Sequence, residues 1–163
     1  MKVNLVLGED QIKEVPRNVL ELSLLVKEML IDDDDEGEVA DIPLPNISYV
    51  TMKQVLQFCD FYVNHEPLGE ITKPLHSSTM ADNVNNEWYA TYIDLVEDVP
   101  RLVLAANYLD IASLVQLGCA KIATLIMSKT EDEVIQQFHI IKDPVINKYA
   151  MKKEEEDGEI VVE

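Results

Sequence analysis

Hydrophobic and polar residues alternate at the start of the chain. Residues 3–7 place Val, Leu and Leu at every second position, which predicts a β-strand with one buried face. A turn sequence follows at 8–10, and residues 11–15 are expected to return as the second strand of a hairpin. Residues 42–46 contain two prolines, so this stretch is expected to be extended and to lie at a sheet edge or in a short strand.

Most apolar positions in the rest of the chain recur at the three- and four-residue spacing of helices. Pro16 is expected to open the first helix, Ser48 to cap the second, and Trp88 to begin a short third. Thr130 and Glu133 form a capping-box sequence, which predicts the start of the last helix. The apolar positions that define these helices are Val19, Leu20, Leu24, Met29 and Leu30; Met52, Val55, Leu56, Cys59, Tyr62 and Val63; Leu102 to Leu109; Leu114, Val115, Gly118, Cys119, Ile122, Leu125 and Ile126; and Val134, Ile135 and Phe138.

The helix expected after Ile111 is apolar on more than one face. Leu117, Ala120, Ala123 and Met127 add a second apolar surface to its main stripe. A helix of this kind either lies inside a large core or has a binding partner. Because the chain has only 163 residues, we favour a partner.

Two stretches show neither strand nor helix periodicity. Residues 32–41 are strongly acidic, and residues 66–86 are polar and interrupted by proline and glycine. Both are expected to be mobile loops, because they lack the apolar residues that offset the entropy of ordering. The first matches three early positions of a calcium-binding EF-hand loop, but Pro43 stands where the twelfth position needs glutamate. A calcium site is therefore not expected.

The net charge of the chain limits the classes of partner that it is expected to bind. Thirteen basic residues against 31 acidic residues give a net charge of −18, which disfavours nucleic acid and anionic membrane as partners. The apolar run at the N-terminus is too short for a signal peptide or a membrane span. Cys59 and Cys119 are isolated and form no disulfide framework, which fits a reducing compartment. We therefore expect a cytoplasmic and nuclear location.

The residue types that carry catalysis are not arranged for it in this sequence. His65 and His76 fall in the polar stretch and His139 follows Phe138, and none has a Cys, Asp or second His at metal-ligand spacing. The sequence also contains no glycine-rich phosphate loop and no known nucleophile motif. We expect the histidines to serve packing or the surface, and we expect no catalytic activity, no metal and no cofactor.

The stretch 104–111 has the sequence Leu-Ala-Ala-Asn-Tyr-Leu-Asp-Ile. It resembles the signature of the Skp family (S-phase-kinase-associated protein one), the F-box-binding adaptors of cullin–RING (SCF) ubiquitin ligases. The resemblance extends over about residues 2–143. Further blocks agree in order and spacing, namely residues 42–46 after an acidic loop, Trp88, residues 129–133 and residues 138–140.

The resemblance implies an α+β fold with three parts. Residues 1–110 would form a BTB/POZ-type domain that binds cullin, and residues 111–143 a helical extension that binds the F-box. The charged tail at 144–163 lacks the tryptophan that family members generally carry near their C-terminus, so it is expected to be mobile. The implied function is to join F-box substrate receptors to a cullin scaffold for protein ubiquitination and degradation.

The family's contact residues can be placed on this sequence. Asn107 and Tyr108 match the pair that lies at the cullin contact in the family. Leu104, Ala105 and Leu109 are expected to be core residues of a BTB fold. The helices after the signature form the F-box surface in the family, which points to Leu117, Cys119, Ile122, Ile126, Phe138 and Ile140.

A BTB-type module with other partners, in an Elongin-C-like or kinetochore role, stays an alternative. Elongin C shares a similar signature block but ends there, whereas this chain continues well beyond Asp110, which favours the F-box adaptor. A weak homodimer of the unbound protein also stays open, since BTB folds often self-associate.

Overall fold

The chain contains two compact units, Met1–Met127 and Ser128–Glu163. The computed structural model describes residues 2–8, 11–31 and 41–140. Helix α5 belongs to the first unit, so this unit extends past the residue 110 boundary proposed for the cullin-binding part. The functional division of the chain at that residue stays a prediction.

Two sequence predictions fall largely outside the described residues. The acidic stretch 32–41 is described only at Asp41, and the tail at 144–163 is not described. The predicted mobility of both segments therefore stays a prediction.

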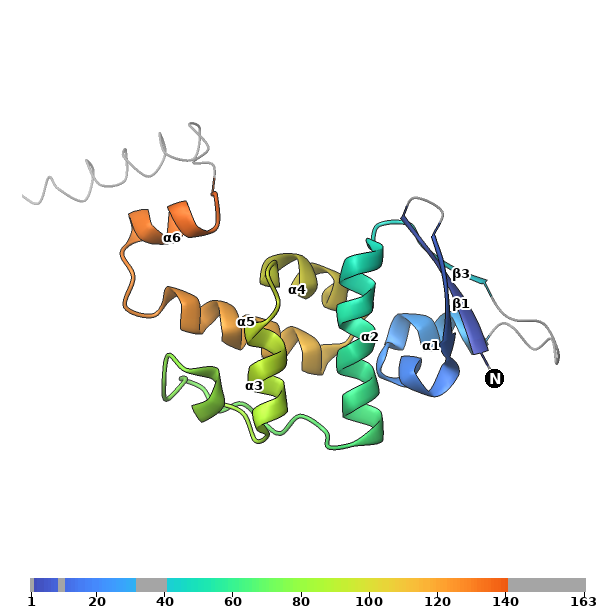
Figure 1. Ribbon diagram of the computed structural model, residues 1–163, viewed down its shortest axis with the longest axis horizontal. Helices are drawn as coiled ribbons and strands as arrows, with labels where there is room; N and C mark the ends of the chain where they lie inside the picture. Colours follow the sequence, from blue (N-terminus) through green and yellow to red (C-terminus); the bar gives the residue numbers. More distant parts are fainter. Residues whose placement is uncertain (1, 9–10, 32–40, 141–163) are drawn as a thin grey trace, which may run out of the picture. The chain divides into compact units, whose positions relative to one another are not determined.

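A three-stranded sheet forms one side of the first unit (Figure 1). The central strand β1 (Lys2–Leu7) pairs antiparallel with β2 (Ile12–Pro16) and parallel with β3 (Asp41–Leu44). In β1 the alternate residues Val3 and Leu5 are fully buried, as the sequence pattern predicts. Strand β3 has four residues and lies at a sheet edge, so the prediction for the proline-containing segment is confirmed.

The other elements of the described chain are helices. Ser48 caps α2 by accepting the Thr51 N–H, and Thr130 and Glu133 form the predicted capping box of α6. In the first unit the helices are the 3-10 helix η2 (Arg17–Leu22), α1 (Leu24–Ile31), α2 (Tyr49–Asn64), the 3-10 helix η3 (Met80–Asp82), α3 (Glu87–Asp94), α4 (Val99–Tyr108) and α5 (Ala112–Ile126); the second unit contains α6 (Glu131–Gln137).

The first helical segment is interrupted at Ser23, where the sequence predicts one continuous helix. The buried Ser23 hydroxyl donates to the Leu109 carbonyl at 2.6 Å and accepts the Val26 N–H at 3.2 Å. The next residue, Leu24, donates its N–H to the Asp110 carbonyl. Ser23 therefore ends η2, starts α1 and ties this region to the end of α4.

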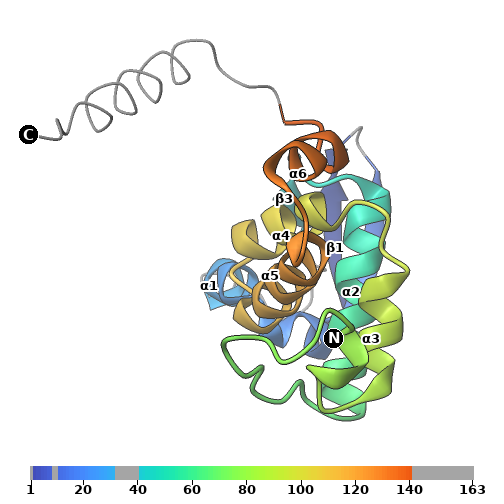
Figure 2. The ribbon, with the colours of Figure 1, turned by 90° about the vertical axis from the view of Figure 1, so that its left-hand side faces the viewer.

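Helix α2 lies between the sheet and the cluster of α3, α4 and α5 (Figure 1). It packs on η2 and on α4, and α4 in turn packs on α5, which Figure 2 shows from a second direction. Aromatic rings join α2 to α3, where Phe61 stacks on Trp88 with ring centroids 3.8 Å apart and Phe58 lies 5.7 Å from Tyr89. A single hydrophobic core thus connects the sheet to α5.

The segment at 66–86, predicted to be a mobile loop, contains buried residues and hydrogen bonds of its own. Met80 and Ile71 are buried, and Met80 begins the short helix η3, which packs on α3. The side chain of Asn85 accepts the Gly69 N–H at 2.8 Å and donates to the Glu66 carboxylate at 3.0 Å, which joins the two ends of the segment. Two apolar residues of the segment are therefore buried although the sequence shows no periodic pattern there, and the mobility of the segment stays a prediction.

Asn83 is the polar centre of this segment and is itself buried. Its side-chain nitrogen donates to the Ser77 and Thr79 carbonyls, both at 2.8 Å, and its side-chain oxygen accepts the His76 N–H at 3.0 Å. One side chain therefore satisfies three backbone groups that would otherwise lack partners.

We expect Asn83→Ala to lower the free energy of unfolding by about 2–3 kcal/mol, since each lost hydrogen bond contributes about 1 kcal/mol. Urea unfolding of the purified chain measures this loss. Asn83→Asp is the matched comparison. It keeps the acceptor for the His76 N–H but cannot donate to the Ser77 and Thr79 carbonyls, so it should also destabilise the fold. An unchanged urea midpoint for Asn83→Ala would mean that the segment does not stabilise the fold.

Candidate partner-binding surfaces

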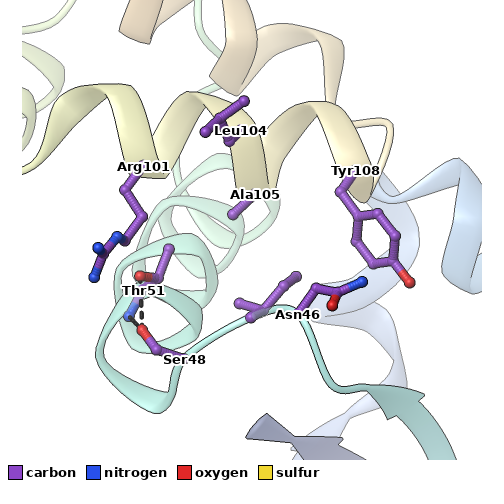
Figure 3. A pocket seen from close by; sticks show the side chains of 8 residues that line it. Asn46, Ser48, Thr51, Arg101, Leu104, Ala105 and Tyr108 are labelled. Atoms are coloured by element: carbon purple, nitrogen blue, oxygen red, sulfur yellow. Dashed lines mark hydrogen bonds between the residues drawn. The ribbon is translucent and has the colours of Figure 1, made fainter. Parts of the chain in front are cut away.

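An exposed face of α4 forms one wall of a groove of about 420 Å³ (Figure 3). The opposite wall is the connection from β3 to α2 together with the first turn of α2. Arg101 and Tyr108 lie at opposite ends of the α4 wall, with Leu104 and Ala105 between them. The lining residues are Asn46, Ile47, Ser48, Thr51, Arg101, Leu104, Ala105 and Tyr108.

The capping of α4 and the burial of its other face determine which side chains reach this groove. Asp98 caps the helix by accepting the Arg101 N–H at 3.0 Å. Leu102 and Ala106 are fully buried, which turns the opposite face to solvent. Leu104 is consequently 70% exposed, and its predicted place in the core is wrong. An apolar residue type indicates that a helix face can be covered, but not that another element covers it.

The predicted cullin pair, Asn107 and Tyr108, lies at the end of α4, and both side chains are exposed. Tyr108 lines the groove, but Asn107 is not among the lining residues. Adjacent helical positions are about 100° apart around the axis, so the two side chains leave the helix in different directions. Asp110 follows in the left-handed conformation, with φ 53°, and turns the chain towards α5.

A second groove, of about 430 Å³, adjoins the first and shares Asn46 and Ser48 with it. Val50 and Tyr49 are exposed there, and the Lys13 Nζ lies 5.3 Å from the centre of the Tyr49 ring. The sequence analysis identifies Ser48 as a helix cap, but it does not identify this group of residues as a binding surface. Exposure of the first turn of a helix leaves no periodic pattern in the sequence. The lining residues are Gly8, Gln11, Pro45, Asn46, Ser48, Tyr49 and Val50.

The exposed face of α5 carries three of the predicted F-box residues. Cys119, Ile122 and Ile126 are three and four residues apart, which places them on one side of the helix. Cys119 and Ile126 are exposed and Ile122 is half-buried. Leu117 points the other way and is fully buried, so its prediction as a contact residue is wrong: it supports α5 from the core.

The second unit contains the other two predicted F-box residues. Phe138 follows α6 and is half-buried, and Ile140 is exposed. Glu133 fixes the start of α6: the Thr130 backbone N–H, at 2.8 Å, and the Thr130 hydroxyl both donate to its carboxylate and lower its pKa. Because protonation removes these bonds, the capping is present above the ordinary glutamate pKa and is lost as pH falls through the lowered pKa.

His65 and Cys59 pack against neighbouring side chains, whereas Cys119 is exposed. The imidazole of His65 stacks on Phe61 with centroids 4.7 Å apart, and burial, followed by the nearby Asp60 charge, raises the pKa of the Cys59 thiol to about 12. Across residues 2–8, 11–31 and 41–140, no three His, Cys, Asp or Glu side chains gather as a metal site. None of the described helices is long and apolar enough to cross a membrane.

A small sheet with helices packed on it and two uncovered apolar helix faces together define an α+β protein-interaction module. Residues 1–64 match the Skp1 family tetramerisation domain, a POZ domain. The chain is 40% identical over 156 residues to the S-phase kinase-associated protein 1 homolog of Tetrahymena thermophila, a match that covers 94% of this chain and 91% of the relative. The chain therefore belongs to the Skp1 family, and the predicted BTB/POZ-type fold is confirmed.

Two fungal relatives carry the name E3 ubiquitin ligase complex SCF subunit sconC. That of Arthroderma benhamiae is 32% identical over 138 residues, covering 79% of this chain and 77% of the relative. That of Aspergillus clavatus is 34% identical over 130 residues, covering 79% of each. Both matches extend well past the POZ domain, so the similarity includes the helices that follow it.

Proposed function

We propose that this chain is the adaptor subunit of an SCF-type ubiquitin ligase, which bridges F-box substrate receptors to a cullin scaffold. The names of its relatives support membership of such a complex. The observation that carries the bridging role is the presence of two separate uncovered faces on α4 and α5, two helices that pack directly on each other. The proposed site of action is the cytoplasm and the nucleus.

The groove along α4 is the proposed cullin surface. Tyr108 offers a large ring that is 41% exposed, and Leu104 adds apolar area beside it. Aromatic side chains of this kind often dominate the binding energy of an interface. Asn107, which lies outside the groove, is proposed to contact the cullin from the side of α4.

The exposed face of α5 is the proposed F-box surface. Cys119, Ile122 and Ile126 supply its apolar contacts, and Phe138 and Ile140 of the second unit are proposed to add to them. An uncovered apolar helix face is what a helical partner can bury. Leu117 is not part of this proposal, because its side chain is in the core.

A pull-down from native lysate with the full-length chain tests the proposed function. Mass spectrometry should identify a cullin together with several F-box proteins. Partners of another class without any cullin would instead favour the BTB module with other partners, and recovery of the chain alone as a dimer would favour self-association.

The labelling rate of the Cys119 thiol tests directly whether an F-box protein covers the proposed F-box surface. A maleimide should label the native chain rapidly at this exposed thiol and slowly at Cys59, which is buried. Binding of an F-box protein should slow the labelling of Cys119 by about tenfold or more, since a covered group reacts only through opening of the complex. Purified cullin should leave the rate unchanged, and Cys119→Ser should remove the rapid phase. An unchanged rate in the F-box complex would place the F-box elsewhere.

A further inference from the structure

The charge of the α4 groove differs from that of the chain as a whole. The sequence has 31 acidic residues against 13 basic residues. Among the described residues that line the groove, no carboxylate occurs and Arg101 is the one charged residue. The polar lining side chains from the opposite wall, Asn46, Ser48 and Thr51, are neutral. The lining of the groove therefore carries one positive charge on an acidic protein, and the Asp98 carboxylate beside the groove offsets it in part.

The guanidinium of Arg101 is only weakly engaged within the chain. Its Nε lies 3.4 Å from the Asp98 Oδ2 in an exposed pair, and such pairs contribute little to stability. The other oxygen of Asp98 accepts the Arg101 backbone N–H as the cap of α4, which holds Asp98 at the start of the helix. This arrangement leaves the two terminal nitrogens of Arg101 for a partner.

The position of Arg101 determines where a partner must place the group that pairs with the guanidinium. Arg101 and Tyr108 are two turns apart on α4 and occupy opposite ends of the groove (Figure 3). Seven residues at 1.5 Å per residue separate them by about 10 Å along the helix axis. A segment that lies along the groove can therefore contact the Tyr108 ring at one end and the Arg101 guanidinium at the other.

We propose that Arg101 is a specificity-determining residue for the cullin: it selects a partner segment whose carboxylate faces the guanidinium, about 10 Å from the contact with Tyr108. This inference rests on the proposed function and names the charge of the partner surface. A guanidinium and a carboxylate match in geometry and form paired hydrogen bonds. A basic partner segment would be attracted by the net charge of the chain but repelled at this groove, so the site discriminates by charge.

Affinity measurements with purified cullin and charge variants of the full chain test the inference. We expect Arg101→Gln to weaken binding by about fivefold and Arg101→Glu by about thirtyfold, because the second change replaces attraction by repulsion. Raising the salt concentration from about 0.05 M to about 0.5 M should narrow both differences through screening. Replacing the matching acidic residue of the cullin with lysine should restore binding to Arg101→Glu.

Lys73→Glu is the control for the change in net charge. Lys73 is exposed in the segment attached to the other end of α2, a helix of 16 residues that spans about 24 Å (Figure 1). This variant should bind cullin within about twofold of wild type, since Lys73 does not line the groove and salt screens charges outside the contact. If wild type binds cullin and Arg101→Glu binds as well or better, the inference is overturned while the proposed function stands. If wild type does not bind cullin, the proposed function fails first.

Discussion

A chain carrying Leu104→Asp and Tyr108→Ala should lose cullin binding by a hundredfold or more, while its affinity for F-box proteins stays nearly unchanged. Loss of a central aromatic side chain costs an interface about 2 kcal/mol, or about thirtyfold in affinity. Leu104 is 70% exposed in the middle of the groove wall, and a carboxylate there would have to be desolvated on binding. Titrations with purified cullin and with an F-box protein measure the two affinities separately.

Leu95→Asp is the matched control for this double variant. Leu95 follows α3, is 76% exposed and does not line the groove, so the same change of residue type should leave cullin affinity within about twofold. Asn107→Ala should weaken cullin binding less than Tyr108→Ala, because Asn107 lies outside the groove. Equal loss of cullin and F-box binding in the double variant would show that the two surfaces are not separate.

Substitution of Gly118 should have the largest effect on stability. This glycine lies where α5 crosses α4, and a Cβ placed on it would lie 2.3 Å from the Val103 Cγ2. Alanine favours a helix by about 1 kcal/mol over glycine, but overpacking a core costs about 1–3 kcal/mol. We expect Gly118→Ala to destabilise by about 1–2 kcal/mol and Gly118→Leu by about 3 kcal/mol or more, because the larger side chain cannot fit between the helices.

Val103→Ala removes the atom that clashes and provides the test of this explanation. Urea unfolding of Gly118→Ala, Val103→Ala and the double variant should show that the double variant is more stable than the sum of the single losses predicts. Both partner affinities should fall with the folded fraction, since α4 and α5 carry the two proposed surfaces. Strict additivity would mean that the close approach of Gly118 and Val103 does not limit the packing.

The sequence predicted the elements whose cause is local. The alternation in β1, the prolines of β3, the Ser48 cap and the Thr130 capping box depend on neighbouring residues, and all are found where expected. The break at Ser23 was not predicted, because it depends on a hydrogen bond to Leu109, which is distant in sequence.

The predictions that the structure contradicts concern which faces of the helices are covered by other elements. Leu104 and Leu117 are the same residue type on apolar helices, yet one is exposed and the other buried, because only tertiary packing decides which face is covered. The burial of Met80 and Asn83 in the segment at 66–86 leaves no periodic pattern in the sequence, so the sequence does not indicate it. The family resemblance indicated the end of α4 correctly as an exposed surface, but not the wall that faces it.

Formation of a ternary complex tests the bridging role most directly. Purified cullin, an F-box protein and this chain should elute together from size exclusion with the mass of a one-to-one-to-one complex, and the F-box protein should not bind cullin when the chain is left out. The Leu104→Asp/Tyr108→Ala chain should carry only the F-box protein. Direct binding of cullin to the F-box protein without this chain, or mutually exclusive binding of the two partners, would contradict the adaptor function.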